Sequence, residues 1–453
     1  MITSRTGASA TPSRSLRYGQ IKTILLLFGG YAACYYCRAD LSVATPLLIE
    51  ELGRHGFSHD AALVRIGTIT SLGVFAYAVG KLFLTGLGDY WGGRRNFLIG
   101  VGGATLFTLC FAAGGGVPVF TLAWIGNRLT QSLGWACLIK VSSRWFDYSS
   151  YGSIVGLLSI SYLLGDAAAR QQMGMLIEHG YGWRSLFLFA AAVAAAMLLA
   201  SLLFLRESRA EQGHPEAAPN PLNLFAAAES RPANVGALLL PLIRSRAFLL
   251  VCVLSFACTI IRETFNTWTP VYLREHLGYS ASHSASMSAV FPGVGVASVL
   301  LAGWLSDRLG LSGRSLLMLV GLAATAAALV ALMSVRPGPA AALPGVALIG
   351  VVAFGLLGPY SYLGGAFALD FGGKQASAVS SGIIDGIGYL GGVLAGDTVA
   401  RVAVDYGWQG VFVSLAAVSA VAAVCAGVLH ALNTRAARAR ATLATAAAET
   451  TGG

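Results

Sequence analysis

Two arginines, Arg38 and Arg262, stand where a charged side chain is most unfavourable, well inside long apolar stretches. An arginine at the centre of a membrane helix costs roughly 2.5–3.5 kcal/mol on insertion scales. The same spacing of arginine, proline and glutamate surrounds both, from Arg38 to Glu51 and from Arg262 to Glu275. A planar guanidinium forms two parallel hydrogen bonds with a phosphate group. This repeated pattern predicts that both side chains line one polar cavity and clamp a single anion.

The acids nearest to these arginines in sequence are not expected to neutralise them. Asp40 lies two residues after Arg38, and Glu263 follows Arg262 directly. Residues one or two positions apart do not face each other on a helix. The alternative interpretation is that each arginine pairs with an acid of another helix, such as Asp166, Asp385 or Asp397.

Further polar and aromatic residues lie on the stretches that would line such a cavity. Lys81 precedes the end of its apolar run by several residues, so it either reaches the cavity or extends its amine to the membrane surface. Tyrosine hydroxyls donate hydrogen bonds to phosphate or sugar oxygens. The candidate tyrosines are Tyr31, Tyr35, Tyr162 and Tyr389.

The composition places all of these residues in a membrane. Hydrophobic residues make up 56% of the chain and charged residues 11%, and the mean hydropathy is +0.69. A soluble surface needs roughly 25–35% charged side chains, so a soluble enzyme and a disordered chain are excluded. The net charge of +10 suits cytoplasmic loops, and no basic stripe predicts binding to nucleic acid. The seven cysteines show no disulfide or zinc spacing, and we expect no metal, cofactor or enzymatic activity.

Runs of roughly twenty apolar residues, long enough to cross a bilayer as helices, recur along the chain. We expect twelve in two sets of six, near 21–48, 64–87, 96–115, 118–140, 151–175 and 184–205, then near 247–272, 283–306, 315–335, 341–369, 376–402 and 408–431. The predicted fold is an all-α membrane protein with twelve transmembrane helices in two pseudo-symmetric six-helix bundles, 21–206 and 247–432. A cytoplasmic linker, 207–246, would join the bundles, with cytoplasmic tails at 1–20 and 433–453.

The two sets repeat each other in sequence. The motif Tyr-Leu-x-Gly at Tyr162 recurs at Tyr389, and Tyr-Gly-Trp at Tyr181 recurs at Tyr406, in the same order and at a nearly constant separation. Even numbers of spans give both halves the same orientation, as in transporters whose site lies between two repeats. Lysine and arginine gather in one set of loops, which predicts that both termini are cytoplasmic.

Short charged loops follow the second and eighth runs. Their glycines permit a tight turn, and their charges can pair across helix ends. We predict a conformational or structural role for their charged residues rather than ligand binding. These residues are Asp89, Arg94, Asp307, Arg308 and Arg314.

With these motifs the sequence resembles the major facilitator superfamily, and within it the organophosphate:phosphate antiporter family. The resemblance covers nearly the whole membrane region and is absent from the linker and tails. It rests on the loop motif and on Gly30–Arg38, Lys81 before Gly88-Asp89, Gly134-Trp135, Arg262 before Trp268-Thr-Pro270 and Gly388-Tyr389. Members include bacterial glycerol-3-phosphate and hexose-6-phosphate transporters and the microsomal glucose-6-phosphate transporter.

This resemblance implies a function and a site. Arg38 and Arg262 would bind the phosphoryl group, and Lys81, Tyr31, Tyr35, Trp135 and Tyr389 would line the cavity. The two halves would rock by alternating access and exchange an organophosphate, such as a sugar phosphate, glycerol phosphate or phosphonate, for inorganic phosphate. The expected setting is the lipid bilayer of a bacterial inner membrane, with the protein as a monomer.

Several residues depart from the family pattern. Tyr162 stands where glycerol-phosphate transporters carry a histidine, and Arg128 resembles a motif of proton-coupled members of the superfamily. The acids Asp40, Asp166, Asp385 and Asp397 suggest either a substrate that carries an amino group or proton coupling. Two alternatives to phosphate exchange therefore stay open: a proton-coupled symporter of an organic anion, and a sugar-phosphate sensor of the same fold.

Overall fold

The computed structural model describes residues 14–84, 91–217 and 235–451, and the regular secondary structure in these ranges is entirely helical. The N-terminal helices are α1 (Arg14–Arg54), α2 (His59–Phe83), α4 (Gly93–Ala113), α5 (Val117–Gln131), α6 (Gly134–Trp145), α7 (Tyr148–Glu178) and α8 (Trp183–Phe204). A 3₁₀ turn, η1 (Arg209–Gln212), and the short helix α9 (Val235–Arg244) follow. The C-terminal helices are α10 (Arg246–Glu275), α11 (Ala281–Ser288), α12 (Val290–Met333), α13 (Ala342–Tyr360), α14 (Ala368–Val393) and α15 (Asp397–Thr451).

Local sequence explains several helix ends. Ser58 and Ser245 cap α2 and α10, because each side chain accepts a hydrogen bond from a backbone N–H three residues later. Gly407 interrupts α15 with a φ of 67°, a conformation that favours glycine. The 3₁₀ turn η2 (Pro339–Ala341) and the π-helix η3 (Leu363–Phe367) flank α13.

The observed helices differ from the predicted runs in three places. The first helix already begins at Arg14, inside the predicted tail. The fourth run is divided into α5 and α6 at Ser132, whose hydroxyl bonds the Leu129 carbonyl and competes with the helix. Between the eighth and ninth runs, helix is assigned without a break through α12, and the two membrane-length segments on either side are Ala281–Leu305 and Gly313–Met333.

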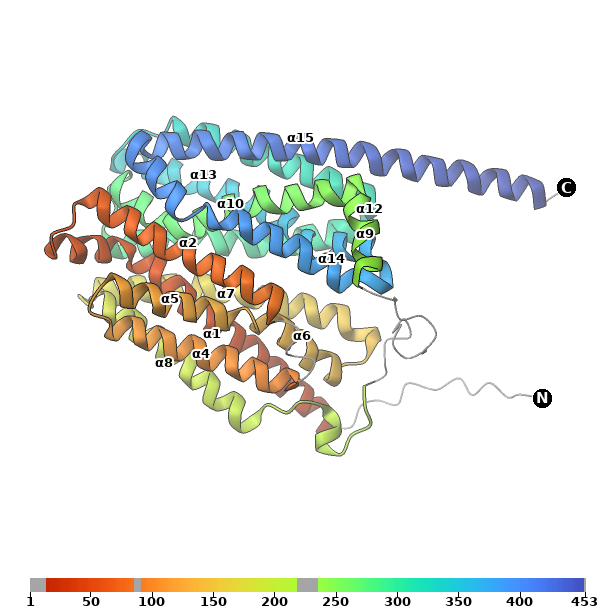
Figure 1. Ribbon diagram of the computed structural model, residues 1–453, viewed down its shortest axis with the longest axis horizontal. Helices are drawn as coiled ribbons and strands as arrows, with labels where there is room; N and C mark the ends of the chain where they lie inside the picture. The colour runs from red at the N-terminus through yellow and green to blue at the C-terminus, as the bar shows by residue number, and fades with distance from the viewer. Residues whose placement is uncertain (1–13, 85–90, 218–234, 452–453) are drawn as a thin grey trace.

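The N-terminal and C-terminal helices pack mainly within their own halves (Figure 1). Helix α1 contacts α7 and α8, and α4 contacts α5 and α8, whereas α10 contacts α14 and α15, and α12 contacts α13 and α15. Between the halves, α2 packs on α14 and α15, α7 packs on α11 and α12, and α1 touches α10. Any site between the halves is therefore bounded by these helices.

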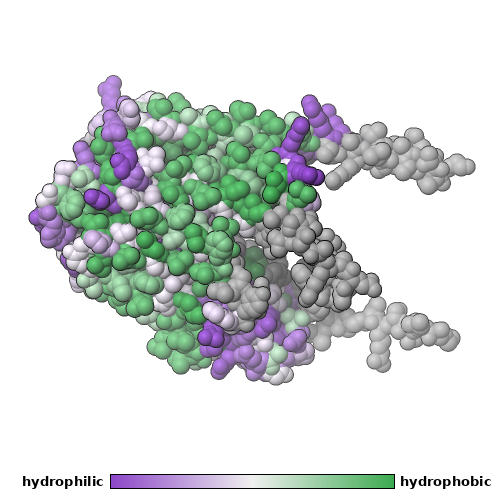
Figure 2. All heavy atoms as spheres, in the orientation of Figure 1, coloured by the Kyte–Doolittle hydropathy of each residue, from purple (hydrophilic) through white to green (hydrophobic). Residues whose placement is uncertain are grey.

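The surface agrees with a membrane environment. In the described residues, eight helical segments are long and apolar enough to cross a bilayer. Figure 2 shows hydrophobic side chains over the middle of the visible face and hydrophilic side chains towards its two ends. The long axis of the molecule therefore runs across the apolar band.

Candidate functional site

A cavity of about 580 Å³ lies between the two halves, bounded by α1, α2, α6 and α7 on one side and by α10, α12, α13 and α14 on the other. This volume is in the range of small-molecule sites. Seven of the eight residues predicted to bind substrate line it: Tyr31, Tyr35, Lys81, Trp135, Tyr162, Arg262 and Tyr389. We call this space the large cavity.

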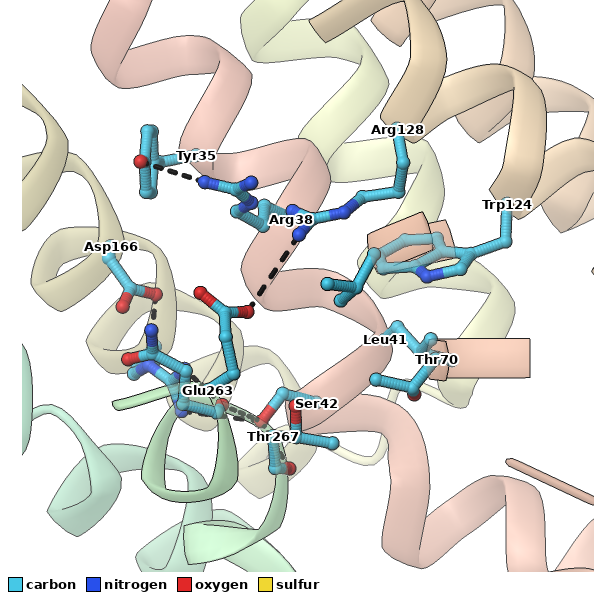
Figure 3. Close-up of a pocket in the computed structure, with 13 residues that line it drawn as sticks. Tyr35, Arg38, Leu41, Ser42, Thr70, Trp124, Arg128, Asp166, Glu263 and Thr267 are labelled. Atoms are coloured by element: carbon cyan, nitrogen blue, oxygen red, sulfur yellow. Dashed lines mark hydrogen bonds and ion pairs between the residues drawn. The ribbon is translucent and has the colours of Figure 1, made fainter. Parts of the chain in front are cut away.

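The eighth residue, Arg38, lines a smaller chamber of about 40 Å³ (Figure 3). Tyr35 lines both spaces, so the chamber adjoins the large cavity at this side chain. The predicted residues Arg128 and Asp166 also line the chamber. Its size admits a few water molecules but no phosphate. The structure thus places Arg38 and Arg262 in neighbouring spaces rather than in one.

The Arg38 guanidinium has unused hydrogen-bond donors. Nη1 donates to the Tyr35 hydroxyl at 2.8 Å, and the guanidinium carbon lies 4.7 Å from the centre of the Tyr77 ring. Nε and Nη2 are buried and have no hydrogen-bond partner among the described residues. Buried donors without partners are unfavourable, so an anion bound beside Arg38 would be stabilised.

Arg262 is paired with its neighbour in sequence, which corrects the prediction that Glu263 leaves it unneutralised. Nη2 of Arg262 donates to Oε1 of Glu263 at 2.6 Å, and both side chains are about 6% exposed. The argument from helix geometry fails here because both side chains are long enough to meet beyond the helix surface. The Arg262 guanidinium also lies 4.8 Å from the Tyr360 ring centre.

Glu263 also faces an arginine of the other half. Its Oε2 lies 3.8 Å from Nη2 of Arg128 on α5, and the Arg128 side chain is 2% exposed. One carboxylate from α10 is therefore shared by two arginines, one in each half (Figure 3 shows the contact with Arg128).

Two tyrosines connect the arginines of the two halves. The rings of Tyr77 on α2 and Tyr389 on α14 lie 4.7 Å apart. Arg38 stacks on Tyr77, and the Tyr389 hydroxyl accepts a hydrogen bond from Arg262 Nη2 at 3.4 Å. Cations near aromatic faces are stabilised by the ring quadrupole. The path Arg38–Tyr77–Tyr389–Arg262 thus crosses the boundary between the halves.

Lys81 reaches the large cavity, where its Nζ lies 3.2 Å from Oδ2 of Asp385 on α14. Both side chains are largely buried, at 15% and 27% exposed. The amine therefore does not extend to the membrane surface, and it adds a second cation to the cavity beside Arg262.

The other predicted acids contact groups other than Arg38 and Arg262. Asp166 accepts from Arg170 Nε at 2.9 Å, and Asp397 binds Thr68 and Arg401. Asp40 accepts the Leu41 amide and lines neither space. The alternative interpretation that Asp166, Asp385 or Asp397 pairs with Arg38 or Arg262 is therefore wrong for this structure.

The two halves are joined by polar contacts of the C-terminal part of α1, the start of α2 and Ser71 with the C-terminal half. We call these contacts the seam. Ser42 donates to the Asn266 carbonyl at 2.7 Å, and His59 Nε2 lies 2.8 Å from Oε1 of Glu275. Arg274 pairs with Glu50. At the gap between α14 and α15, the Ser71 hydroxyl of the N-terminal half donates to the Val393 carbonyl at 2.6 Å and accepts from the Asp397 amide at 2.8 Å. Within the C-terminal half, the Trp268 indole donates to the Ala395 carbonyl of the same gap at 2.7 Å.

The predicted loop residues lie away from both spaces. Arg94 donates to the Leu205 and Leu202 carbonyls, Arg314 pairs with Asp370 at 2.8 Å, and Arg308 stacks on Trp304. Asp89 and the Asp307 side chain lie outside the described residues.

Four residues of the site were missed from the sequence. Tyr77 and Tyr360 line the large cavity, and Arg170 lines the chamber together with Glu263. Two of them could have been predicted from helical spacing, because Tyr77 lies four residues before Lys81 and Arg170 four residues after Asp166, which places each on the same helix face as a predicted residue. No sequence pattern indicated Tyr360, because its position in the cavity depends on how α13 packs.

The whole region suits an anion. Arginines and a lysine face two adjoining spaces, and tyrosines supply hydroxyl groups beside them. No group of histidine, cysteine or acidic residues suited to a metal ion occurs in the described part of the chain.

Comparison with known proteins identifies the family. Residues 24–396 match the Major Facilitator Superfamily. The chain belongs to this superfamily. It is thus an integral membrane transporter and not an enzyme, as predicted.

Individual relatives are distant in sequence but align with most of the transporter. The transporter is 25% identical over 424 residues to the probable hexose phosphate transport protein of Chlamydia trachomatis serovar D, with 91% of each chain covered. It is 25% identical to human sugar phosphate exchanger 3, covering 82% of this transporter and 81% of the relative. A crystal structure of a D-xylose–proton symporter has the same fold, with a TM-score of 0.70 and 15% identity over 90% of this transporter and 97% of that chain.

Proposed function

We propose that this transporter exchanges an organophosphate for inorganic phosphate by alternating access. The observation that carries the proposal is Arg38, a partly buried arginine with two buried nitrogens that have no partner among the described residues, on the other side of the tyrosine pair from Arg262. A phosphoryl group in the large cavity would contact Arg262 and Lys81 directly, and it would reach Arg38 if Tyr35, which lies between the two spaces, moved aside. The names of the Chlamydia and human relatives, which refer to hexose phosphate and sugar phosphate exchange, support this substrate class.

The described helices are compatible with twelve spans in two bundles, 21–206 and 247–432. In this proposal α5 and α6 form one span, α12 forms parts of two, and α15 after Gly407 forms the last. Both termini and the linker 207–246 would be cytoplasmic, in a bacterial inner membrane, and the protein would act as a monomer. The seam would then close the outer side, with the large cavity on the cytoplasmic side of it.

The positive charge of the site explains why transport would be an exchange of one anion for another. An empty site with unneutralised cations resists closure by the second half, and a bound dianion removes that penalty. If the loaded form alone crosses readily, each substrate that leaves must be replaced by phosphate.

The test uses purified protein in liposomes loaded with labelled phosphate. Addition of organophosphates outside should release the label, and Arg38→Lys and Arg262→Lys should each abolish most of this release, because lysine keeps the charge but loses the two-pronged geometry. Arg336→Lys, at an exposed position in the loop after α12, is the matched control and should behave as the wild type. Full exchange by either cavity variant would reject the two-arginine site.

Proton coupling is the second candidate, favoured by the buried acids Glu263 and Asp166 in the chamber. In that case a pH gradient would drive uptake into liposomes that contain no phosphate. Tight binding without flux in either assay would instead indicate a sensor.

A further inference from the structure

Glu263 occupies an unusual position for an acid in an anion site. Its two oxygens lie 2.6 Å from Arg262 and 3.8 Å from Arg128, and none of the three side chains is more than 6% exposed. Glu263 is thus the acid of a buried ion pair with two guanidinium groups, one from each half. It therefore removes one unit of positive charge from the region where the phosphoryl group would bind.

The charged residues of the large cavity and the chamber leave a definite surplus. Five cations and three carboxylates line the two spaces, so two positive charges stay uncompensated. The cations are Arg38, Lys81, Arg128, Arg170 and Arg262, and the carboxylates are Asp166, Glu263 and Asp385. Arg170 and Lys81 have their own acids, Asp166 and Asp385. The surplus therefore lies with Arg38, Arg128 and Arg262, because Glu263 pairs with Arg128 and Arg262 only and Arg38 has no carboxylate of its own among the described residues.

We propose that Glu263 sets this surplus at two and thereby makes the transporter selective for dianionic phosphoryl groups over trianionic ones. The inference rests on the proposed function and adds a selectivity to it. A phosphate monoester carries close to two negative charges above neutral pH, so it neutralises the surplus. A phosphorylated carboxylate carries three, and one negative charge would stay unpaired when the halves close around it. Net charge left in a buried site opposes closure.

Removing the carboxylate should change the selectivity in a defined direction. Glu263→Gln keeps the size of the side chain and raises the surplus to three. Relative to glycerol 3-phosphate, 3-phosphoglycerate should then bind about tenfold better than it does to the wild type, as expected for one unit charge at short range in a partly buried site. The double variant Arg128→Gln/Glu263→Gln returns the surplus to two and should restore the wild-type ratio.

The experiment measures displacement of labelled inorganic phosphate from the purified full-length transporter by the two esters at about pH 8, where both are fully ionised. The ratio of the two affinities is the readout, because it does not depend on the fraction of protein that folds. Glu51→Gln, at an acid outside both spaces, is the control for loss of one negative charge and should leave the ratio unchanged.

The outcomes separate this inference from the proposed function. An unchanged ratio in Glu263→Gln, with phosphate still bound, overturns the role of Glu263 and leaves the proposed function intact. A double variant that keeps the altered ratio shows that Glu263 acts through local packing rather than charge, which also overturns the inference. Absence of phosphate binding by the wild type rejects the proposed function, and this inference with it.

Discussion

Lys81 of α2 and Asp385 of α14 form an ion pair between the two halves, with Nζ and Oδ2 3.2 Å apart, and both side chains line the large cavity. A bound phosphoryl group would therefore compete with Asp385 for the lysine amine. The pair links occupancy of the cavity to contact between the halves.

We expect Lys81→Met to weaken phosphate binding by about tenfold, because it removes one cation and leaves Asp385 without its partner beside the anion. The double variant Lys81→Met/Asp385→Asn should recover part of this loss, since the unpaired carboxylate is then gone. Displacement of labelled phosphate measures both. Equal affinities in the single and double variants would show that the two residues are not coupled.

Tyr35 positions Arg38 through the 2.8 Å hydrogen bond from Nη1 to its hydroxyl. Tyr35→Phe should therefore lower phosphate affinity by about ten- to a hundredfold, which corresponds to the roughly 1.5–3 kcal/mol of one hydrogen bond to a charged group. Tyr36 is the matched control, because it follows Tyr35 on α1, lines neither space and donates its hydroxyl hydrogen bond to Gln172 instead. A loss in Tyr36→Phe as large as that in Tyr35→Phe would argue against a specific role of the bond to Arg38.

Gly396 allows the seam to close. A Cβ atom at this position would lie 2.4 Å from the Gly67 carbonyl oxygen and 2.6 Å from the Ser71 amide nitrogen, so Gly396→Ala should force α2 away from the gap between α14 and α15. Disulfide formation between cysteines placed at His59 and Glu275, which contact each other across the seam, should slow severalfold. Gly293→Ala, where an added Cβ meets nothing within 4 Å, should leave the rate unchanged. Rapid cross-linking in both variants would mean that the seam tolerates the methyl group.

Glu207 stabilises the start of α4. Its Oε1 accepts from the Gly93 amide at 2.9 Å and its Oε2 from the Arg94 amide at 2.6 Å. Glu207→Ala should lower the free energy of unfolding by about 1–2 kcal/mol, as expected when a helix N-terminus loses its acidic cap. The melting temperature in detergent measures this, with Glu178→Ala, at an exposed glutamate at the end of α7, as the control. An unchanged melting temperature would show that water replaces the cap at no cost.

The membrane character, the family and most of the residues around the large cavity could be predicted from the sequence, because they depend on composition and on patterns that repeat within the chain. Arg262 and Tyr389 belong to such repeats, and both line the cavity. Lys81 belongs to no repeat, but it precedes the Gly88-Asp89 motif, and it lines the cavity as well.

The pairing of charges could not be predicted in the same way. Helical spacing shows which side chains share a face, but it does not show how far a long side chain bends or which helix lies opposite. Glu263 was dismissed on its spacing from Arg262, and its second partner, Arg128, comes from α5, 135 residues earlier in the chain. The division of the fourth run at Ser132 also depends on one local hydrogen bond that competes with the helix.

The gap between α14 and α15 has a consequence for how readily the halves part. Ser71 bonds main-chain atoms of Val393 and Asp397 there, the last residue of α14 and the first residue of α15. Incoming solvent can take over both hydrogen bonds as soon as α2 withdraws. When the halves separate, hydrogen bonds to Ser71 are therefore replaced by hydrogen bonds of similar strength to water. This keeps the closed and the separated arrangements of the halves close in free energy, which a carrier that must adopt both requires.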